Sequence, residues 1–352
     1  MHRITLIPGD GIGPEVTAAA RSIVEASGAA VEFDAVLSGQ EAERATGTPL
    51  PAAVFESIAG TKLAMKGPTY TPFGGSYRVS VERPNMEGRL ERRTYPSTAI
   101  ALRKELGLYI AVRPIKNYPS VPTRYQGVDL VIFRENSEDL YVGNERMVDE
   151  DTAEAIKIVT RGASARAARF SYEYMRKVGR RKVTIGHKSN VMKMTDGLFL
   201  KTAQEVARDF PDLTVDQRVI DALCMELVTK PESFDGLLLM NLYGDIVSDL
   251  AAGLVGGLGL APGANIGADC AMFEAVHGTA PDIAGKDIAN PTAMILSAVL
   301  MLRYIDEAAA ADRIESALTS VLAKKRAITR DLGGSAGTRA FAAAIVQRLQ
   351  KS

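Results

Sequence analysis

Residues 236–250, GLLLMNLYGDIVSDL, decide the fold class, because an apolar run of strand length leads through polar residues into a helical pattern. A short apolar run of this kind is typical of a strand buried in a sheet. The alternation of such runs with helices predicts an α/β protein. Three other segments show the same order: RITLIP before a helix over 14–27, VDLVIF before a helix after Thr152, and KVTIGH before a helix over 196–210.

Asp245 and Asp249 stand four residues apart in this stretch, so a helix would place both carboxylates on one face. One interpretation is an acidic N-terminal turn that the helix dipole favours, which accounts for either residue singly. The other is half of an oxygen cage for a divalent cation, which would relieve the repulsion between the two charges. The pair alone leaves both interpretations open.

Composition restricts the class of protein. A chain of 352 residues with 46% hydrophobic and 24% charged residues is long enough for two domains with real cores. Lys plus Arg equals Asp plus Glu at 42 each, so we expect no nucleic-acid partner. Cys224 and Cys270 are too few for a disulfide framework, and the apolar runs are too short to span a bilayer. These features, together with an N-terminus that lacks a secretory signal pattern, predict a cytoplasmic protein with no membrane partner.

Polar residues follow the apolar runs: RENSED follows Phe133, HKSN follows Ile185, DALC follows Ile220 and NLYGD follows Met240. Ligands of α/β sheets bind beyond the carboxyl ends of the strands, so this placement favours an enzyme cleft. The glycines of PGDGIGPE near the N-terminus only superficially match a dinucleotide fingerprint, because the spacing differs and Asp10 would repel a pyrophosphate. We therefore predict a tight turn between a strand and a helix there, and no Rossmann fold.

Arg103, Arg113 and Arg134 are candidate anion-binding residues. An isolated Arg usually only solvates a surface. Arg134, however, directly follows the apolar run VDLVIF, where a fixed guanidinium suits bidentate recognition of a carboxylate. Together the three arginines indicate an anionic substrate with more than one carboxylate.

Lys188 and Tyr141 are candidates for proton transfer. Lys188 past a strand end is either an exposed loop residue or a general base, since burial readily lowers the pKa of a lysine. Tyr141 is either a core aromatic or, beside cations, a proton donor. Asp221 after another strand would be the third carboxylate of a Mg²⁺ or Mn²⁺ site with Asp245 and Asp249.

A family resemblance covers nearly the whole chain. The sequence resembles the β-decarboxylating dehydrogenases that act on isocitrate, isopropylmalate and homoisocitrate. The motifs that carry the resemblance occur in order as IPGDGIGPEV, KGPTYTP, LRKELGLYIAVRP, FRENSEDLY, GHKSNVMKMTDGLF, NLYGDIVSDLAAGLVGGLGLAPGANIG and EAVHGTAPDIAGKDIANPTAMILSA.

The resemblance implies a two-domain fold with one sheet spanning both domains. Residues 1–108 and 256–352 would form the large cofactor-binding domain, and residues 109–255 the small domain with the metal ligands and the contacts of a homodimer. In this family Lys188 and Asp221 would reach the active site of the neighbouring subunit. The implied roles are Tyr141 and Lys188 as catalytic residues, Ser97, Arg103, Arg113 and Arg134 as substrate ligands, and Asp221, Asp245 and Asp249 as metal ligands.

The segment after Phe273 is either a surface loop before a Pro-initiated helix or, as the resemblance implies, the cofactor loop. NADP-dependent relatives typically have Lys-Tyr where this sequence has Asp282 and Ile283, and a carboxylate there repels a 2′-phosphate, so NAD is expected. The implied cofactor-binding residues are Thr71, Glu274, His277, Gly278, Thr279, Ala280, Asp282, Ile283 and Asn290.

The substrate prediction is isocitrate, a tricarboxylate of the tricarboxylic acid cycle, which would be oxidised by NAD and decarboxylated to 2-oxoglutarate. Ser97, six residues before Arg103, resembles the isocitrate branch, whereas Ala99 stands where that branch usually has Asn. Homoisocitrate is the nearest alternative, then isopropylmalate, and a different class is the non-catalytic regulatory subunit of a hetero-oligomer. An insertion near 76–96 carries five arginines that could reach a further carboxylate: Arg78, Arg83, Arg89, Arg92 and Arg93.

Overall fold

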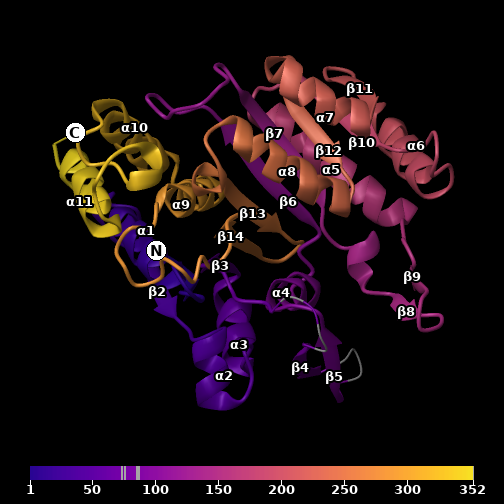
Figure 1. Ribbon diagram of the computed structural model, residues 1–352, viewed down its shortest axis with the longest axis horizontal. Helices are drawn as coiled ribbons and strands as arrows, with labels where there is room; N and C mark the ends of the chain where they lie inside the picture. Colours follow the sequence, from indigo (N-terminus) through magenta and orange to yellow (C-terminus); the bar gives the residue numbers. More distant parts are fainter. Residues whose placement is uncertain (73, 75–76, 85–87, 352) are drawn as a thin grey trace.

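A ten-stranded mixed sheet runs through the whole molecule (Figure 1). The structure is a computed structural model that describes residues 1–72, 74, 77–84 and 88–351. The α/β fold with one sheet along the chain is confirmed. In sheet order the strands are β11 Thr214–Val219, β10 Lys182–His187, β12 Gly236–Leu239, β7 Asp129–Glu135, β6 Ile110–Lys116, β13 Pro262–Ile266, β14 Ala271–Ala275, β3 Leu63–Lys66, β1 His2–Ile7 and β2 Val31–Ala35.

The strands β11, β10, β12 and β7 are parallel, and so are β14, β3, β1 and β2. Between these two groups β6 pairs antiparallel with both β7 and β13, and β13 pairs antiparallel with β14. The carboxyl ends of β11, β10, β12 and β7 therefore meet at one edge of the sheet. This edge receives the polar segments noted in the sequence.

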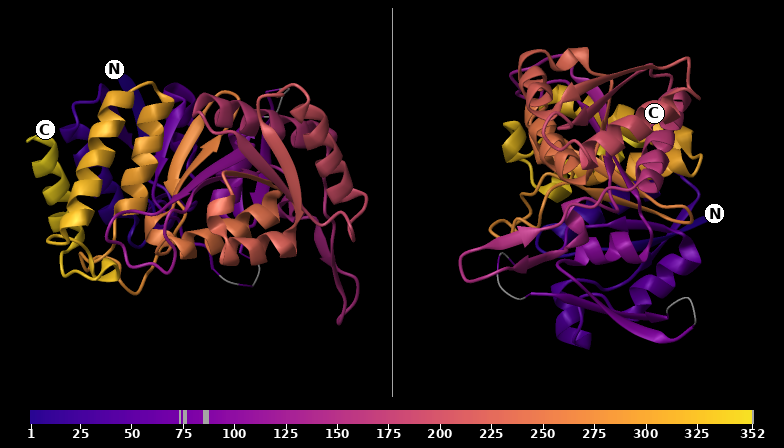
Figure 2. Two further views of the ribbon diagram at one scale, coloured as in Figure 1. Left: turned by 90° about the horizontal axis from the view of Figure 1, so that it is seen from above. Right: turned by 90° about the vertical axis from the view of Figure 1, so that its right-hand side faces the viewer.

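Helices cover both faces of the sheet. In β7, Val131 and Phe133 pack in one core with α5 and α6, whereas Leu130 and Ile132 face a second core with α7 and α8. At the other end, helices from the two chain termini pack together beside β1 and β3 (Figures 1 and 2). The longer helices are α1 Gly13–Ala26, α2 Gln40–Thr46, α3 Ala52–Thr61, α4 Thr98–Glu105, α5 Arg161–Lys177, α6 Thr195–Ala207, α7 Ile220–Thr229, α8 Asn241–Leu254, α9 Thr292–Tyr304, α10 Ala308–Lys324 and α11 Thr338–Leu349.

The glycine-rich N-terminal segment forms the predicted tight turn between β1 and α1. Gly11 has φ +61°, and a Cβ there would lie 2.0 Å from the carbonyl oxygen of Thr279. The Ile12 amide donates to that same oxygen at 2.9 Å. Asp10 accepts the backbone amides of Gln40 and Tyr70, each at 2.7 Å. The turn thus fastens three loops together beside the segment expected to bind the cofactor.

The helix expected after Thr152 is present, but a hairpin comes before it. The strands β8 Glu145–Met147 and β9 Ala153–Ala155 form a hairpin that projects from the body (Figures 1 and 2). Helix α5 begins only at Arg161, where the Thr160 hydroxyl accepts the Ala163 amide and caps the helix.

The insertion near 76–96 also contains a hairpin, β4 Val79–Pro84 with β5 Leu90–Tyr95, although residues 76 and 85–87 lie outside the described residues. In the part of the chain that the structure describes, no helix combines the length and apolar character of a membrane span. The division into domains at 108 and 255 stays a prediction, because one sheet crosses both boundaries.

Candidate active site

Arg134 lies near the carboxyl end of β7 and is held by the start of α8. Its side chain is 1% exposed, and Nε and Nη2 donate to Asn241 Oδ1 at 2.9 and 2.7 Å. A Cβ on Gly244 would lie 2.6 Å from the Cβ of Arg134, so only glycine allows this close approach of helix and strand. Asn241 and Gly244 of the NLYG segment therefore fix the Arg134 guanidinium, which faces Asp245.

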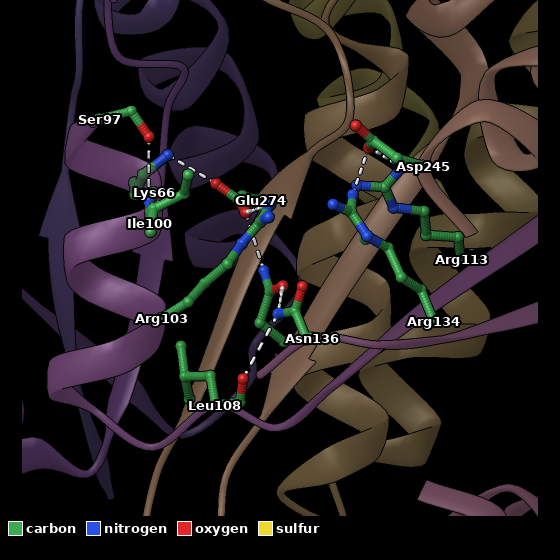
Figure 3. A network of polar contacts seen from close by, with 12 residues as sticks. Lys66, Ser97, Ile100, Arg103, Leu108, Arg113, Arg134, Asn136, Asp245 and Glu274 are labelled. Carbon is green, nitrogen blue, oxygen red and sulfur yellow. Dashed lines mark hydrogen bonds and ion pairs between the residues drawn. The ribbon is translucent and has the colours of Figure 1, made fainter. Parts of the chain in front are cut away.

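Asp245 and Asp249 lie on one face of α8, as their spacing predicts, and buried arginines oppose their charges. Figure 3 shows Arg113 and Arg134 beside Asp245. Arg134 pairs with Asp245, and Arg113 Nη1 lies 3.5 Å from Asp245 Oδ1 and 3.8 Å from Asp249 Oδ1. The Tyr141 hydroxyl donates to Asp245 Oδ2. The acidic first-turn interpretation is wrong, because α8 begins at Asn241 and has no acidic residue in its first turn.

The charges of this arginine–aspartate cluster shift its proton equilibria. Burial works to raise the pKa of Asp245, but Arg134, the Tyr141 hydrogen bond and Arg113 outweigh it and hold the pKa below its usual value. Burial raises the pKa of Asp249 despite Arg113. Burial and the hydrogen bond to Asp245 raise the pKa of Tyr141, so its hydroxyl stays protonated at neutral pH and can donate.

A second polar network centres on Glu274 of β14 (Figure 3). Lys66 Nζ at the end of β3 donates to Glu274 Oε2 at 2.5 Å, and Asn265 Nδ2 donates to Oε1 at 2.8 Å. Arg103 of α4 lies 3.4 Å from the same carboxylate. Burial would raise the pKa of Glu274, yet Lys66 and Arg103 lower it to about 2. Glu274 is therefore ionised and orients two cations.

A cavity joins the two networks. Its lining includes Arg103 and Arg113 from the cationic side, Glu274, and His277 from the following loop. Burial lowers the pKa of His277, so its imidazole is neutral at pH 7. Two guanidinium groups that could bind an anion therefore line one side of the cavity, and the loop that begins at Val276 lines the other.

Lys188 and Asp221 form a separate pair at the ends of β10 and β11. Lys188 Nζ lies 2.6 Å from Asp221 Oδ1, and the two side chains are 28% and 68% exposed. Lys188 also makes a backbone hydrogen bond, since its amide donates to Asp196 Oδ2 at 2.7 Å. Over the described residues, no three His, Cys, Asp or Glu side chains come together in a metal-binding group. Within one chain, Asp221 therefore does not join Asp245 and Asp249.

The segment over 276–291, between β14 and α9, has the irregular backbone expected of a ligand-binding loop. Ala280 has φ +39°, and His277 Nε2 is buried with no hydrogen-bond partner among the described residues. Asn290 Nδ2 donates to Asp331 Oδ2 at 2.8 Å. The remaining cofactor candidates lie on this segment or near it: Thr71 after β3, and Gly278, Thr279, Asp282 and Ile283 within the loop.

Ser97 has a structural contact that the sequence does not reveal. Its Oγ accepts the Ile100 amide at 3.2 Å and caps α4 (Figure 3). Within the insertion, Arg83 and Arg93 turn toward Glu105, and Arg93 Nη1 lies 3.4 Å from its carboxylate. The hairpin therefore ties two of its arginines to the helix that carries Arg103.

A cavity lined by Arg103, Arg113, Glu274 and His277 is typical of an enzyme of the α/β class with a charged ligand. Residues 3–346 match the model of the isocitrate/isopropylmalate dehydrogenase family, so the chain belongs to that family. It superposes on the crystal structure of isocitrate dehydrogenase from Methylococcus capsulatus with a TM-score of 0.91 and 46% identity, covering 99% of this chain and 100% of that one.

Two similar proteins have different roles. The chain is 45% identical over 346 residues to catalytic subunit 5 of mitochondrial NAD isocitrate dehydrogenase from Arabidopsis thaliana, covering 98% of this chain and 88% of that protein. It is 41% identical over 353 residues to a regulatory subunit of the mitochondrial NAD enzyme from Dictyostelium discoideum, covering 100% and 93%. The predicted class, a decarboxylating NAD-dependent dehydrogenase, agrees with these matches. The prediction of a cytoplasmic location is contradicted, because these relatives are mitochondrial proteins.

Sequence reasoning missed four polar residues that hold the site: Lys66, Asn265, Asp196 and Asp331. Three of them lie in quoted motifs: Lys66 begins KGPTYTP, Asp196 lies in GHKSNVMKMTDGLF and Asn265 lies in the motif that ends in GANIG. Their contacts were missed because the partners lie on other elements or across turns, where no local pattern in the sequence marks them.

Proposed function

We propose that this protein oxidises isocitrate with NAD and decarboxylates it to 2-oxoglutarate and carbon dioxide in the presence of Mg²⁺ or Mn²⁺. One observation supports this most strongly: Arg113 and Arg134 are almost fully buried yet face a cavity or a partly exposed carboxylate. Burying two guanidinium groups costs free energy unless anions pair with them. A substrate with three carboxylates suits this cluster, together with Arg103, better than an apolar-tailed acid does.

The side chains suggest a division of roles. Arg103, Arg113 and Arg134 would hold the substrate carboxylates, and Tyr141 would return a proton to the substrate carbon after carbon dioxide leaves. Lys188 of the neighbouring subunit would assist removal of the hydroxyl proton. When bound, NAD supplies the hydride acceptor and the divalent cation supplies a Lewis acid.

Asp245 and Asp249 fit a hard divalent cation because both are partly exposed carboxylates on one helix face, with 39% and 54% of their side chains accessible. Asp221 would complete the ligand set from the neighbouring subunit. At the cofactor loop, His277 and Asn290 would contact the adenine and Asp282 the ribose hydroxyls. The carboxylate of Asp282 disfavours a 2′-phosphate, which is why we propose NAD rather than NADP.

The proposed site is shared between two subunits of a homodimer. In one chain Lys188 pairs with Asp221, whereas Tyr141 and the arginines contact Asp245, and no direct contact joins these two groups among the described residues. A contiguous patch of exposed apolar side chains marks an interaction surface. Among the described residues, many of the exposed large hydrophobic side chains lie between 140 and 246: Leu140, Met147, Val148, Ile156, Ile158, Val178, Val191, Met194, Met225, Val228 and Ile246.

Subunit mixing tests the shared site. We expect the Arg113→Ala and Lys188→Ala homodimers to be nearly inactive, because the first lacks a substrate anchor and the second a base. In a mixed dimer, one site combines the intact Arg113 of one chain with the intact Lys188 of the other. Random reassociation of equal amounts makes about half of the dimers mixed, so about a quarter of wild-type activity should return. No recovery in mixed dimers verified by mass measurement would mean that each site lies within one chain.

A substrate panel tests the reaction. The purified chain should show its highest kcat/KM with isocitrate and NAD when isocitrate, homoisocitrate and isopropylmalate are each assayed with NAD and with NADP. A preference for homoisocitrate would change only the substrate, whereas a preference for isopropylmalate would show that the polar pocket has been misinterpreted.

A regulatory subunit is the second candidate, because a relative with that role is 41% identical over 353 residues. Turnover by the purified chain alone would exclude it. The complete set of proton-transfer and anion-binding side chains favours the catalytic role. We also propose the division into a cofactor domain, 1–108 with 256–352, and a central domain, 109–255, which separate expression of 109–255 and a folding assay would test.

A further inference from the structure

Lys157 lies between two buried carboxylates that no step of the proposed reaction uses. Its side chain is 8% exposed, and its Nζ lies 2.7 Å from Asp196 Oδ1 and 3.7 Å from Asp139 Oδ1. The two carboxylates are 0% and 2% exposed. The same ammonium lies 4.8 Å from the centre of the Tyr243 ring. Burying a lysine this deeply costs free energy unless opposite charges lie close to it. Asp196 and Asp139 supply these charges, so the three groups form an ion-pair triad.

Asp139 connects this triad to the elements that carry Tyr141 and Asp245. Its Oδ1 accepts the Leu140 amide at 2.9 Å and so caps the short helical turn that contains Tyr141. Its Oδ2 accepts the Leu242 amide at 2.9 Å in the first turn of α8. One carboxylate therefore sets the proton donor and the aspartate-bearing helix relative to each other.

The backbone of Asp139 has a conformation that its contacts must hold in place. It has φ 72° and ψ −150°, a region that residues other than glycine rarely adopt. The Asp139 amide is fixed by the Ile158 carbonyl at 2.8 Å, next to Lys157 in the chain. Strained backbone persists only where the surroundings hold it, and here the surroundings are the ion pair and the two capped amides.

Asp196 connects the triad to Lys188. One of its oxygens binds Lys157, and the other accepts the Lys188 amide at 2.7 Å. Asp196 also lies in the first turn of α6, where a carboxylate is favourable. Within one chain, Lys157 thereby connects the turn that carries Tyr141 with the segment that carries Lys188.

We propose that Lys157 is a positioning residue that couples the two active sites of the dimer. The inference rests on the proposed shared site, in which Tyr141 of a chain serves one site and Lys188 of the same chain serves the other. Through Asp139 the ammonium fixes one site, and through Asp196 it fixes the other. A displacement of Asp139 or of Asp196 would therefore affect both sites, because the two carboxylates share the single ammonium of Lys157.

Mixed dimers separate the two arms. A dimer of an Arg113→Ala chain with a Lys188→Ala chain retains one intact site, which takes its base from the first chain and its Tyr141 from the second. Lys157→Met is then introduced into either chain. We expect kcat to fall about tenfold or more in both placements, since misplacement of a reacting group by about 1 Å costs up to ~100-fold.

The KM for isocitrate should rise only when the Lys188→Ala chain carries Lys157→Met, because that chain supplies the substrate-binding arginines. Single-arm variants provide the matched comparison. Asp196→Asn should lower activity only in the chain that supplies the base, and Asp139→Asn only in the chain that supplies Tyr141. Lys157→Arg keeps the charge and should restore much of the activity in both placements, which a general loss of packing would not explain. Lys116→Met, which removes a surface ion pair with Glu315, should leave the activity unchanged.

A readout without catalysis is amide hydrogen exchange of the homodimers. Lys157→Met should reduce the protection of both the Lys188 and the Leu242 amides, whereas Lys116→Met should reduce neither. Activity lost in only one placement, or exchange changed at only one amide, would overturn the coupling while leaving the shared site intact. If the parent mixed dimer is itself inactive, the shared site fails and the coupling with it.

Discussion

Replacing Lys66 by Met should destabilise the protein by removing the main counter-charge of Glu274. The Lys66 and Glu274 side chains are 2% and 12% exposed, and Nζ lies 2.5 Å from Oε2. Met has a similar length but no charge, so the carboxylate would keep only Arg103, at 3.4 Å, and its hydrogen bond from Asn265. A buried charge that loses its partner is expensive.

The magnitude follows from the proton equilibrium of Glu274. Its pKa falls from 4.5 to about 2, and at about 1.4 kcal/mol per pKa unit this corresponds to about 3 kcal/mol that favours the ionised form. Lys66 is the largest favourable contribution, and removal of one partner from a buried pair costs about 3–5 kcal/mol. For 352 residues the unfolding entropy is roughly 0.7 kcal/mol per degree, so Tm should fall by about 4 °C or more.

The assay is calorimetric unfolding at one protein concentration, because dimer stability depends on concentration. The folded pKa of Glu274 lies below its unfolded value, so its contribution is present above about pH 4.5 and is lost as the pH falls toward 2. The difference between wild type and Lys66→Met should therefore be full at pH 7 and shrink below pH 4.5.

The double variant Lys66→Met/Glu274→Gln should be more stable than the sum of the single changes indicates, because neither member of the Lys66–Glu274 pair is then left charged without the other. Lys116→Met removes a half-exposed ammonium from its pair with Glu315 and from the Tyr118 ring, and should shift Tm by about 1 °C or less. A Tm for Lys66→Met equal to that of this control, or a loss that does not depend on pH, would refute the reasoning.

Two further predictions concern the ligands. Chelation should abolish turnover and Mg²⁺ or Mn²⁺ should restore it, and Asp245→Asn should raise the metal concentration needed for half-maximal activity; full activity in thoroughly stripped protein would exclude a metal role. Replacing Asp282 by Lys and Ile283 by Tyr should narrow the preference for NAD over NADP in kcat/KM, because it removes a carboxylate that repels a 2′-phosphate, and a wild-type preference for NADP would contradict the assignment.

The parallel strands β1, β7, β10 and β12 were predictable from the sequence because each contains a short apolar run followed by polar residues. The antiparallel centre was not. The strands PGANI and AMFEA are rich in small residues and lack the alternation of apolar and polar residues that marks a half-buried strand. The hairpin after Gly143 was not predicted, and the helix expected after Thr152 begins only beyond its cap at Thr160. The sequence does not say which of several possible starts the backbone uses.

The site was partly predictable for a similar reason. Arg134 and Lys188 could be found because one lies near the carboxyl end of a buried strand and the other directly follows one, and strand ends meet at one edge of a sheet. The pairing of Lys66 with Glu274 joins residues 208 positions apart, and no local pattern encodes such a contact. The same holds for Lys157, whose two partners stand on either side of it in the chain and meet only in the folded protein.

For the two aspartates of α8, the structure excludes one of the interpretations that the sequence leaves open. A helix dipole stabilises carboxylates only within about the first turn, whereas Asp245 and Asp249 follow the first residue of α8 by four and eight positions. Their repulsion is instead met by Arg113 and Arg134. The guanidinium groups that pair with the two aspartates would also attract the carboxylates of a substrate. A substrate that arrives with a divalent cation would therefore compete for the arginines, while its cation would compete for the aspartates. The cation would take the aspartates and the substrate would take the arginines, which gives a physical reason why metal and acid would bind together.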